Sequence, residues 1–423
     1  MIRWLIKFFN TDGLLKDSSI FFVGLSLAQA INLGFQMMMG RLLSASEFAL
    51  LVSLISLFSL LTFPLGVVST AINRYTRLLV LQEREGDAHQ LLSRWFFRLL
   101  SLALICSAVV FLFASKVAGF LHLNRMAPVY IFALILPGVF CSPVSNGALL
   151  GLQRFKTWSA GVVLGSLVRL LFGVLLVAFV SPFAGWGLLG HGCGFYAMLS
   201  LGLTSIFFYL RGLSSSSQPL PSLDKYLFSS FFIMLGFAVL MSGDMILIKH
   251  LMPEEAGTFS YASILGHLVL FLPQSLVSSM FPKVVADGSV SREKRNLLFK
   301  TLLAVFLSAS ATALFLSLTA QILPCWIFGI KHPNPLLAVW LRELSWAMVP
   351  VALLSVIMRY ALAQHRLRAA FLIPSSALIY LAVSLIYSRS PDHLLLALLV
   401  ATLLAVFGLI FLILKEKPLS KLD

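Results

Sequence analysis

Charged residues are scarce in this chain: Asp, Glu, Lys and Arg make up 11% of its 423 residues, against about 25% in soluble domains. Acidic residues are the rarer sign, 16 against 31 basic residues. Hydrophobic residues make up 59%, and the mean hydropathy is +0.97. A soluble fold could not keep so much apolar surface from water, and disordered chains have the opposite composition. The composition therefore predicts a polytopic membrane protein.

The features typical of metal centres and catalytic sites are also missing. The four cysteines form no CxxC pair, which favours packing thiols over a disulfide framework, a metal site or a redox site. No phosphate-binding loop, zinc motif or catalytic triad pattern appears. A net charge of +15 would suggest nucleic acid in a soluble protein, but these basic residues lie between apolar runs. We expect no enzyme activity, no cofactor, no metal and no nucleic-acid partner.

Long apolar runs dominate what is present. A helix needs about 20 such residues to cross the bilayer core. The chain offers twelve candidate spans, at 18–40, 48–73, 96–115, 128–150, 158–180, 187–210, 226–249, 256–281, 297–324, 337–364, 369–387 and 394–414. The fold class predicted is an all-α membrane protein of about twelve transmembrane helices.

The basic residues orient these spans. If the N-terminus is inside, 23 of the 31 basic residues lie in the inner segments. Cytoplasmic loops of membrane proteins carry such an excess, so both termini are predicted to be cytoplasmic. The segment 1–17 before the first span includes an amphipathic stretch, which predicts a position at the inner interface.

The two halves of the chain resemble each other. At an offset of 209 residues, 41–74 aligns with 250–283 without a gap, and Pro64 meets Pro273. Near an offset of 213, Pro137 meets Pro350. Six spans in each half give both halves one orientation, as in transporters built from parallel repeats. This predicts an N-terminal lobe over 1–211, a cytoplasmic linker over 212–225, a C-terminal lobe over 226–423, and a central cleft.

Ionisable residues inside spans are candidates for function, because a charge at the bilayer centre costs about 2.5–3.5 kcal/mol. Arg169 lies in the middle of the fifth span, and Asp244 lies in the seventh. Each has a structural alternative. Arg169 could serve as a buried hydrogen-bonding group, and Asp244 could cap a helix or pair with Lys249 or another basic group.

Further candidates lie nearer the ends of spans. Arg359 is close to the inner end of the tenth span, where it could extend to lipid phosphates. Arg342 and Glu343 start the same span and could form an interfacial pair. His267, in the eighth span, could carry a proton or act as a packed hydrogen-bonding residue.

Polar residues form two stripes at helical spacing. The first span has Gln29, Asn32 and Gln36 on one face, and the eighth has a similar set: Ser260, Ser263, His267, Gln274 and Ser278. Such stripes either join helices to each other or line a water-filled cleft.

Several segments are similar to those of a known family. The run from Ser242 through Asp244 to Gly257 and Ala262 resembles the seventh-to-eighth helix signature of polysaccharide flippases, which belong to the multidrug/oligosaccharidyl-lipid/polysaccharide exporter superfamily. Phe-Leu-Pro at 271–273, Phe-Pro at 281–282, the segment 40–48 and Leu-Gln-Arg-Phe at 152–155 also fit. The departure is Ser-Tyr at 260–261, since the family often has Tyr nearer to Gly257.

The resemblance implies a flippase of the bacterial inner membrane. Its cargo would be a polyprenyl-diphosphate-linked oligosaccharide, moved to the periplasmic leaflet by alternating access and driven by a gradient of H⁺ or Na⁺. Membrane lipids, a polysaccharide polymerase and glycosyltransferases are the expected partners. Substrate-binding residues in the cleft would be Arg169, Arg359, Gln29, Asn32, Gln36 and Gln274, and ion-coupling residues would be Asp244, His267 and Glu343.

Two other functions stay open. A cation-coupled multidrug antiporter of the same superfamily would be expected to have several embedded acids, whereas only Asp244 lies well inside a span. A membrane-embedded polysaccharide polymerase or acyltransferase usually needs a large outer loop, and the longest ones here, 116–127 and 325–336, have twelve residues each.

Overall fold

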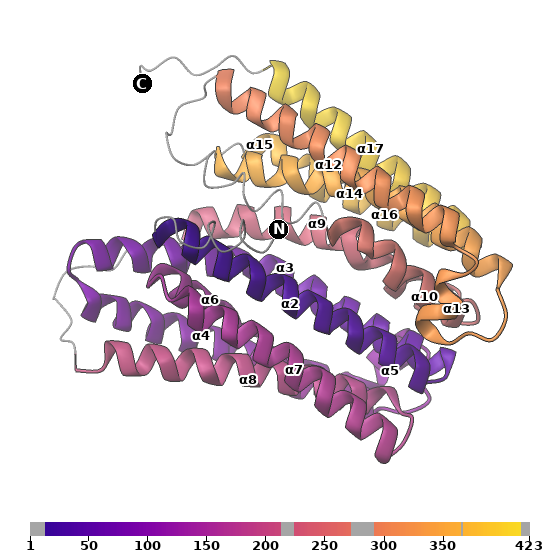
Figure 1. Cartoon of the computed structure of the whole chain (residues 1–423), viewed down its shortest axis with the longest axis horizontal. Coiled ribbons are helices and arrows are strands. Elements are labelled where there is room, and N and C mark those ends of the chain that lie inside the picture. The colour runs from indigo at the N-terminus through magenta and orange to yellow at the C-terminus, as the bar shows by residue number, and fades with distance from the viewer. Residues whose placement is uncertain (1–12, 213–223, 272–291, 365–366, 416–423) are drawn as a thin grey trace, which may run out of the picture. The chain divides into compact units, whose positions relative to one another are not determined.

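The computed structural model describes residues 13–212, 224–271, 292–364 and 367–415, and these residues are almost entirely helical (Figure 1). No strand occurs among them. The chain divides into two compact units, one from residues 1–44 and 65–227 and the other from 45–64 and 228–423. Most of the predicted linker, 212–225, and most of the predicted interfacial segment, 1–17, lie outside the described residues.

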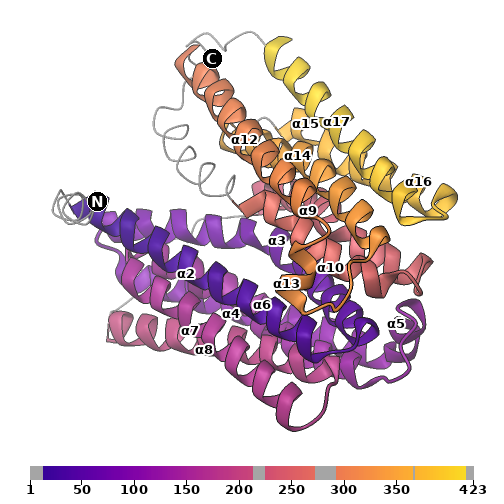
Figure 2. The ribbon, with the colours of Figure 1, turned by 45° about the vertical axis from the view of Figure 1, so that its right-hand side comes forward.

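The first unit holds the helices that precede residue 211. They are α2 (Gly13–Leu42), the second part of α3 (Ala45–Leu81), α4 (Glu85–Leu112), the short α5 (Ala114–Phe120), α6 (Ala127–Gly151), α7 (Phe155–Phe179) and α8 (Ala184–Leu210). α7 packs against both α8 and α2, and α6 packs against α4 and α8 (Figure 2).

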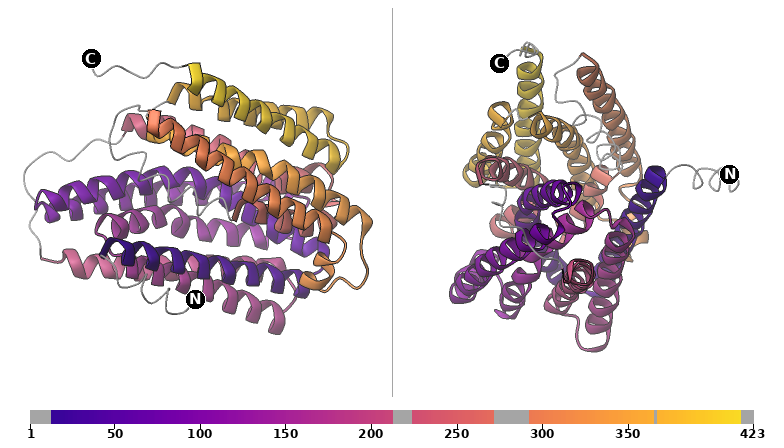
Figure 3. Two further views of the ribbon diagram at one scale, coloured as in Figure 1. Left: turned by 45° about the horizontal axis from the view of Figure 1, so that its top comes forward. Right: turned by 90° about the vertical axis from the view of Figure 1, so that its left-hand side faces the viewer.

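The second unit holds the helices from α9 onward and the first part of α3. They are α9 (Asp224–Leu251), α10 (Ala256–Gly266), the 3₁₀ turn η1 (His267–Leu270), α12 (Arg292–Thr319), α13 (Leu323–Phe328), α14 (Pro335–Ala363), α15 (Leu367–Ala370), α16 (Leu372–Tyr387) and α17 (Pro391–Lys415). α14 packs against α12, α10 and α17, and α16 packs against α17 (Figure 3).

The predicted spans correspond to helices in the structure. Ten helices of the described part are long and apolar enough to cross a membrane. The predicted span 369–387 corresponds to the shorter apolar helix Leu372–Tyr387, and the first part of the span 256–281 corresponds to Ala256–Leu270. Residues 272–281 of that span lie outside the described residues. The span predicted at 297–324 extends past its helix, because α12 ends at Thr319 and α13 begins at Leu323, with Pro324 in its first turn. The protein is a multi-pass, all-α membrane protein.

Helices at equivalent positions of the repeat pack in the same pairs. In the first unit these pairs are α4 with α6, α6 with α8 and α7 with α8. In the second unit the counterparts α12 with α14, α14 with α17 and α16 with α17 are again packed together. The internal repeat inferred from the aligned segments and prolines of the sequence is therefore also a repeat of helix packing.

The first part of α3 departs from a division by chain order. Residues 45–64 pack with the second unit, although the N-terminal lobe was predicted to include everything up to residue 211. Aromatic contacts account for this, because the Phe48 ring stacks on Tyr261 and the Phe63 ring lies against Phe237. The division falls directly after Pro64.

Several prolines of the apolar runs lie inside helices of the structure. Pro64 lies within α3, Pro137 within α6 and Pro350 within α14. Pro374 differs, because it occupies the first turn of α16, where no amide hydrogen bond is lost. Pro273 lies outside the described residues.

Candidate functional site

The first candidate site surrounds Arg169, in the middle of α7. Its Nη1 donates a hydrogen bond to the Oδ1 atom of Asn32 on α2, over 3.1 Å. The guanidinium carbon lies 4.2 Å from the centre of the Phe35 ring, also on α2. An arginine over an aromatic face gains a cation–π interaction that is strongest where water is excluded. α2 therefore fixes the guanidinium by an amide oxygen and an aromatic face one turn apart.

Glycines make this arrangement possible. A Cβ atom at Gly173 would lie 2.7 Å from the Phe35 ring, so only glycine leaves the ring its place. Across the helix pair, a Cβ atom at Gly190 of α8 would lie 2.5 Å from the backbone of Gly173. A Cβ atom at Gly194 would lie 3.1 Å from the Cβ atom of Arg169. Small residues let membrane helices approach closely, and here they bring α7, α8 and α2 together around one arginine.

The Arg169 guanidinium has donor capacity left. A guanidinium carries five N–H donors, and its Nε atom is buried without a hydrogen-bond partner among the described residues. A buried donor without an acceptor is costly. An anionic oxygen placed there would satisfy both the charge and the open N–H.

His191 adjoins this arginine and was not among the predicted residues. It is buried on α8, close enough to Arg169 for their charges to interact. Its ring lies edge-on to Phe195, with centroids 5.1 Å apart. The sequence signal was its place in the glycine-rich run 185–194 of α8, the helix that follows the one carrying Arg169.

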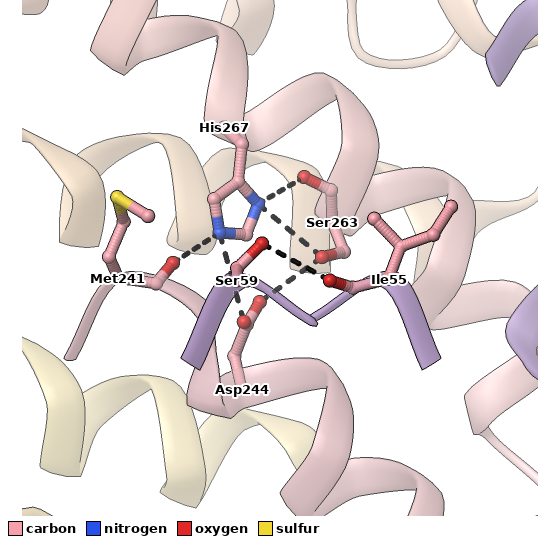
Figure 4. Close-up of polar contacts among 6 residues, drawn as sticks. All are labelled: Ile55, Ser59, Met241, Asp244, Ser263 and His267. Atoms are coloured by element: carbon pink, nitrogen blue, oxygen red, sulfur yellow. Dashed lines mark hydrogen bonds and ion pairs between the residues drawn. The ribbon is translucent and has the colours of Figure 1, made fainter. Parts of the chain in front are cut away.

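The second candidate site is a cluster around Asp244 of α9, which is 1% exposed (Figure 4). Ser263 of α10 donates from Oγ to Asp244 Oδ2 over 3.2 Å. The Nε2 atom of His267 lies 3.8 Å from Asp244 Oδ1. The second polar stripe thus reaches the embedded acid of the neighbouring helix. The basic group beside Asp244 is His267, and no ion pair joins Asp244 to Lys249 among the described residues.

The His267 ring also bridges two backbone segments. Its Nε2 lies 2.6 Å from the carbonyl oxygen of Met241 on α9, and its Nδ1 lies 2.6 Å from that of Ser263 on α10 (Figure 4). The side chain is 26% exposed, in contrast to the carboxylate beside it. Because His267 follows Ser263 by four residues, the two side chains lie on the same face of the helix.

Tyr380 of α16 is a second residue that the sequence did not point to. It is fully buried and lies close enough to Asp244 for their charges to interact. Its hydroxyl has no hydrogen-bond partner among the described residues. Tyr380 is one of two tyrosines in the mostly apolar α16, and its position follows no pattern that sequence reasoning could use.

The other predicted residues lie outside these two clusters. Arg359 of α14 makes no hydrogen bond or ion pair with another described residue, and it belongs to the other unit than Arg169. Glu343 lies beside Asp392 at the start of α17. Arg342 donates a hydrogen bond to the Ser317 carbonyl oxygen instead of pairing with Glu343.

The amides of the first stripe have separate environments. Gln29 is half-buried, and the Oε1 atom of Gln36 is buried without a partner among the described residues. Only Asn32 contacts a predicted charge. Gln274 lies outside the described residues. In the described part of the chain, no group of three or more His, Cys, Asp or Glu side chains could hold a metal ion.

Comparison with known proteins identifies the fold. No family model and no curated protein matches the sequence. The lipid II flippase MurJ in an inward closed conformation is similar in structure, with a TM-score of 0.70 and 13% identity over 93% of this chain and 87% of the flippase.

Multidrug transporters share the same architecture. An inward-facing multidrug resistance MATE family transporter of the MOP superfamily has a TM-score of 0.69 and 12% identity, over 94% of this chain and 100% of the transporter. The MATE transporter ClbM in complex with Rb⁺ has a TM-score of 0.62 and 13% identity, over 96% of this chain and 94% of ClbM. The chain therefore has the fold of the multidrug/oligosaccharidyl-lipid/polysaccharide exporter superfamily.

Proposed function

We propose that this protein is a flippase that moves a polyprenyl-diphosphate-linked oligosaccharide from the cytoplasmic to the periplasmic leaflet of the bacterial inner membrane, with both termini in the cytoplasm. The observation that carries the proposal is the Arg169 guanidinium, which α2 holds in place while its Nε donor stays unsatisfied. The fold shared with a lipid II flippase supports the same class of cargo.

The chemistry of the cargo fits this group. A diphosphate offers several anionic oxygens, and a guanidinium binds two of them with parallel N–H donors. In a low-dielectric site such charge-assisted hydrogen bonds contribute about 1.5–3 kcal/mol each. The polyprenyl tail would stay in the bilayer, so only the anionic and sugar parts need a polar path.

Other polar groups supply the rest of the path. Arg359 would provide a second guanidinium near the cytoplasmic side of α14, where it has no described partner. The amides of Gln29, Gln36 and Gln274 would donate to and accept from sugar hydroxyls. The cluster of Asp244 and His267 would couple an ion gradient to the movement of the lobes, with Glu343 as the alternative acid. Glycosyltransferases would build the lipid-linked sugar before this protein moves it, and a polymerase would act on it afterwards.

The test is translocation of a fluorescent polyprenyl-diphosphate oligosaccharide by the purified protein in vesicles. We expect Arg169→Ala to reduce the initial rate about 10- to 100-fold, the equivalent of about 1.5–3 kcal/mol. Arg169→Lys should recover part of the rate, because lysine keeps the charge but lacks the planar fork. Arg98→Ala is the matched control, since Arg98 is exposed and also stacks on an aromatic ring, that of Trp95.

Equal rates for wild type and Arg169→Ala would contradict the proposal. The antiporter alternative predicts instead that the vesicles accumulate a lipophilic cationic dye and that Arg169→Ala does not slow this uptake. The structural neighbours with a multidrug resistance MATE fold make the dye a necessary comparison. A polymerase or acyltransferase would change the mass of the lipid-linked sugar, which mass spectrometry of the recovered lipid detects.

A further inference from the structure

The shortest contact of each His267 ring nitrogen is with a group that can only accept a hydrogen bond. Ser263 Oγ also lies 3.4 Å from Nδ1, but this hydroxyl donates to Asp244 Oδ2. Met241 O and Ser263 O are each 2.6 Å from a ring nitrogen, which is a short hydrogen-bond distance (Figure 4). A backbone carbonyl has lone pairs and no hydrogen. Each of the two ring nitrogens must therefore supply the hydrogen of its own bond.

A neutral imidazole cannot do this. It has one N–H donor and one bare nitrogen, and only the imidazolium has two donors. With a neutral ring, one nitrogen lone pair would face a carbonyl lone pair across 2.6 Å, whichever tautomer is chosen. The hydrogen-bond network therefore assigns a proton to both nitrogens and a positive charge to the ring.

The compensating negative charge is next to the ring. Asp244 Oδ1 lies 3.8 Å from His267 Nε2, and Oδ2 accepts the Ser263 hydroxyl. Because Asp244 is 1% exposed, its charge would be costly without a neighbouring cation. The imidazolium supplies that cation from within the chain.

Among the described residues, Tyr380 of α16 is a further titratable group near Asp244. α14 presents Leu344 to Gly266 beside the ring, and its Glu343 lies against Asp392. The first part of α3 brings the hydroxyl of Ser59 to the cluster, where it donates to the carbonyl oxygen of Ile55 in its own helix (Figure 4).

We propose that His267 carries the coupling proton and that the Asp244 cluster takes a proton, not a metal cation; this rests on the transport function proposed above. The carboxylate already has a counter-ion of charge +1, so a sodium ion would have to displace it. The proton leaves from Nε2 to water, which the 26% exposure of the side chain allows. The bare Nε2 then faces the Met241 oxygen, so the ring turns away and the link from η1 to α9 is lost.

The test is the protonation state of His267 in the full chain, embedded in lipid and labelled with ¹⁵N-histidine. We expect solid-state NMR to detect a ring with two hydrogen-bonded N–H groups that disappears in His267→Gln. The exposed His393 provides the control, because His393→Gln should leave that signal in place. Asp244→Asn should abolish the signal at a pH at which the wild type has it, since the counter-charge is gone.

Three results would overturn the assignment. One is a His267 ring that is neutral at every pH at which the protein stays folded. Another is a doubly protonated signal that survives unchanged in Asp244→Asn. This comparison still tests the assignment if His267→Gln does not fold. The third is loss of the signal when NaCl replaces choline chloride, because sodium would then be the ion that binds.

This measurement does not depend on the cargo. If the fluorescent lipid-linked sugar is not moved but the Asp244-dependent imidazolium is present, the flippase proposal fails and the proton site stands. If the sugar is moved by a sodium gradient and the ring is neutral, the flippase proposal stands and the proton site fails.

Discussion

At the scale of single residues, the two embedded charges are held by groups from other helices. Arg169 of α7 is bound by Asn32 and Phe35 of α2. Asp244 of α9 is bound by Ser263 of α10 and faces His267 of η1. An embedded charge without partners is expensive, so such residues occur where several helices can each provide one contact.

Phe35 is predicted to position Arg169 for the anion. Phe35→Leu keeps an apolar side chain against Gly173 but removes the aromatic face, which contributes about 0.5–2 kcal/mol. We expect the KM for the lipid-linked sugar to rise by about 2- to 30-fold with little change in the maximal rate.

Thermal unfolding separates this effect from packing. Phe140→Leu serves as the control, since Phe140 is buried on α6 of the same unit. Both variants should lose similar stability, and only Phe35→Leu should raise the KM. Equal KM values in the two variants would mean that the ring does not position the guanidinium.

At the scale of elements, α7 and α8 pack backbone to backbone through glycines. The Gly190 Cα is next to the Gly173 backbone, and Gly194 is next to that of Gly165. Between membrane helices there is no hydrophobic driving force, so close van der Waals packing stabilises the pair. This contact also keeps Arg169 in position relative to α2.

Gly190→Ala is predicted to destabilise the first unit. The added Cβ atom would lie 2.5 Å from backbone atoms that cannot rotate away, and overpacking of this kind costs about 1–3 kcal/mol. We expect a lower Tm in detergent. Gly34→Ala is the matched control in α2, because no atom lies within 4 Å of its added Cβ and alanine favours a helix. A Tm for Gly190→Ala at or above that of Gly34→Ala would contradict this packing.

At the scale of the whole molecule, one helix belongs to both units. α3 contributes residues 45–64 to the second unit and continues in the first, with the division at Pro64. Three pairs of equivalent helices pack together in both units. The two units therefore share these three helix pairings, and α3 contributes residues to both.

Orientation in the membrane is the prediction at this scale. With the four native cysteines replaced, Lys331→Cys should react with an impermeant thiol reagent in intact cells, because 325–336 is a predicted outer loop. Lys156→Cys, in a predicted inner segment, should react only after lysis. The reverse pattern would place both termini outside and contradict the proposed direction of transport.

Much of the fold could be predicted from the sequence, because hydropathy is a local property. Whether a run of apolar residues is long enough to span the membrane does not depend on what it contacts in the fold. The predicted spans of the described residues therefore correspond to helices. The sites were predicted only in part. Helical spacing placed Asn32 and Ser263 on polar faces, but nothing local indicated that these faces turn toward Arg169 and Asp244.

The sequence by itself determined that the protein is a multi-pass helical membrane protein with a repeat, because composition and periodicity suffice for that. Only the tertiary structure decided what each embedded charge contacts. Asn32 and Arg169 are separated by 137 positions, and Tyr380 reaches Asp244 from another helix. Such partners depend on which helix faces pack together, and side-chain shape over the whole bundle decides that.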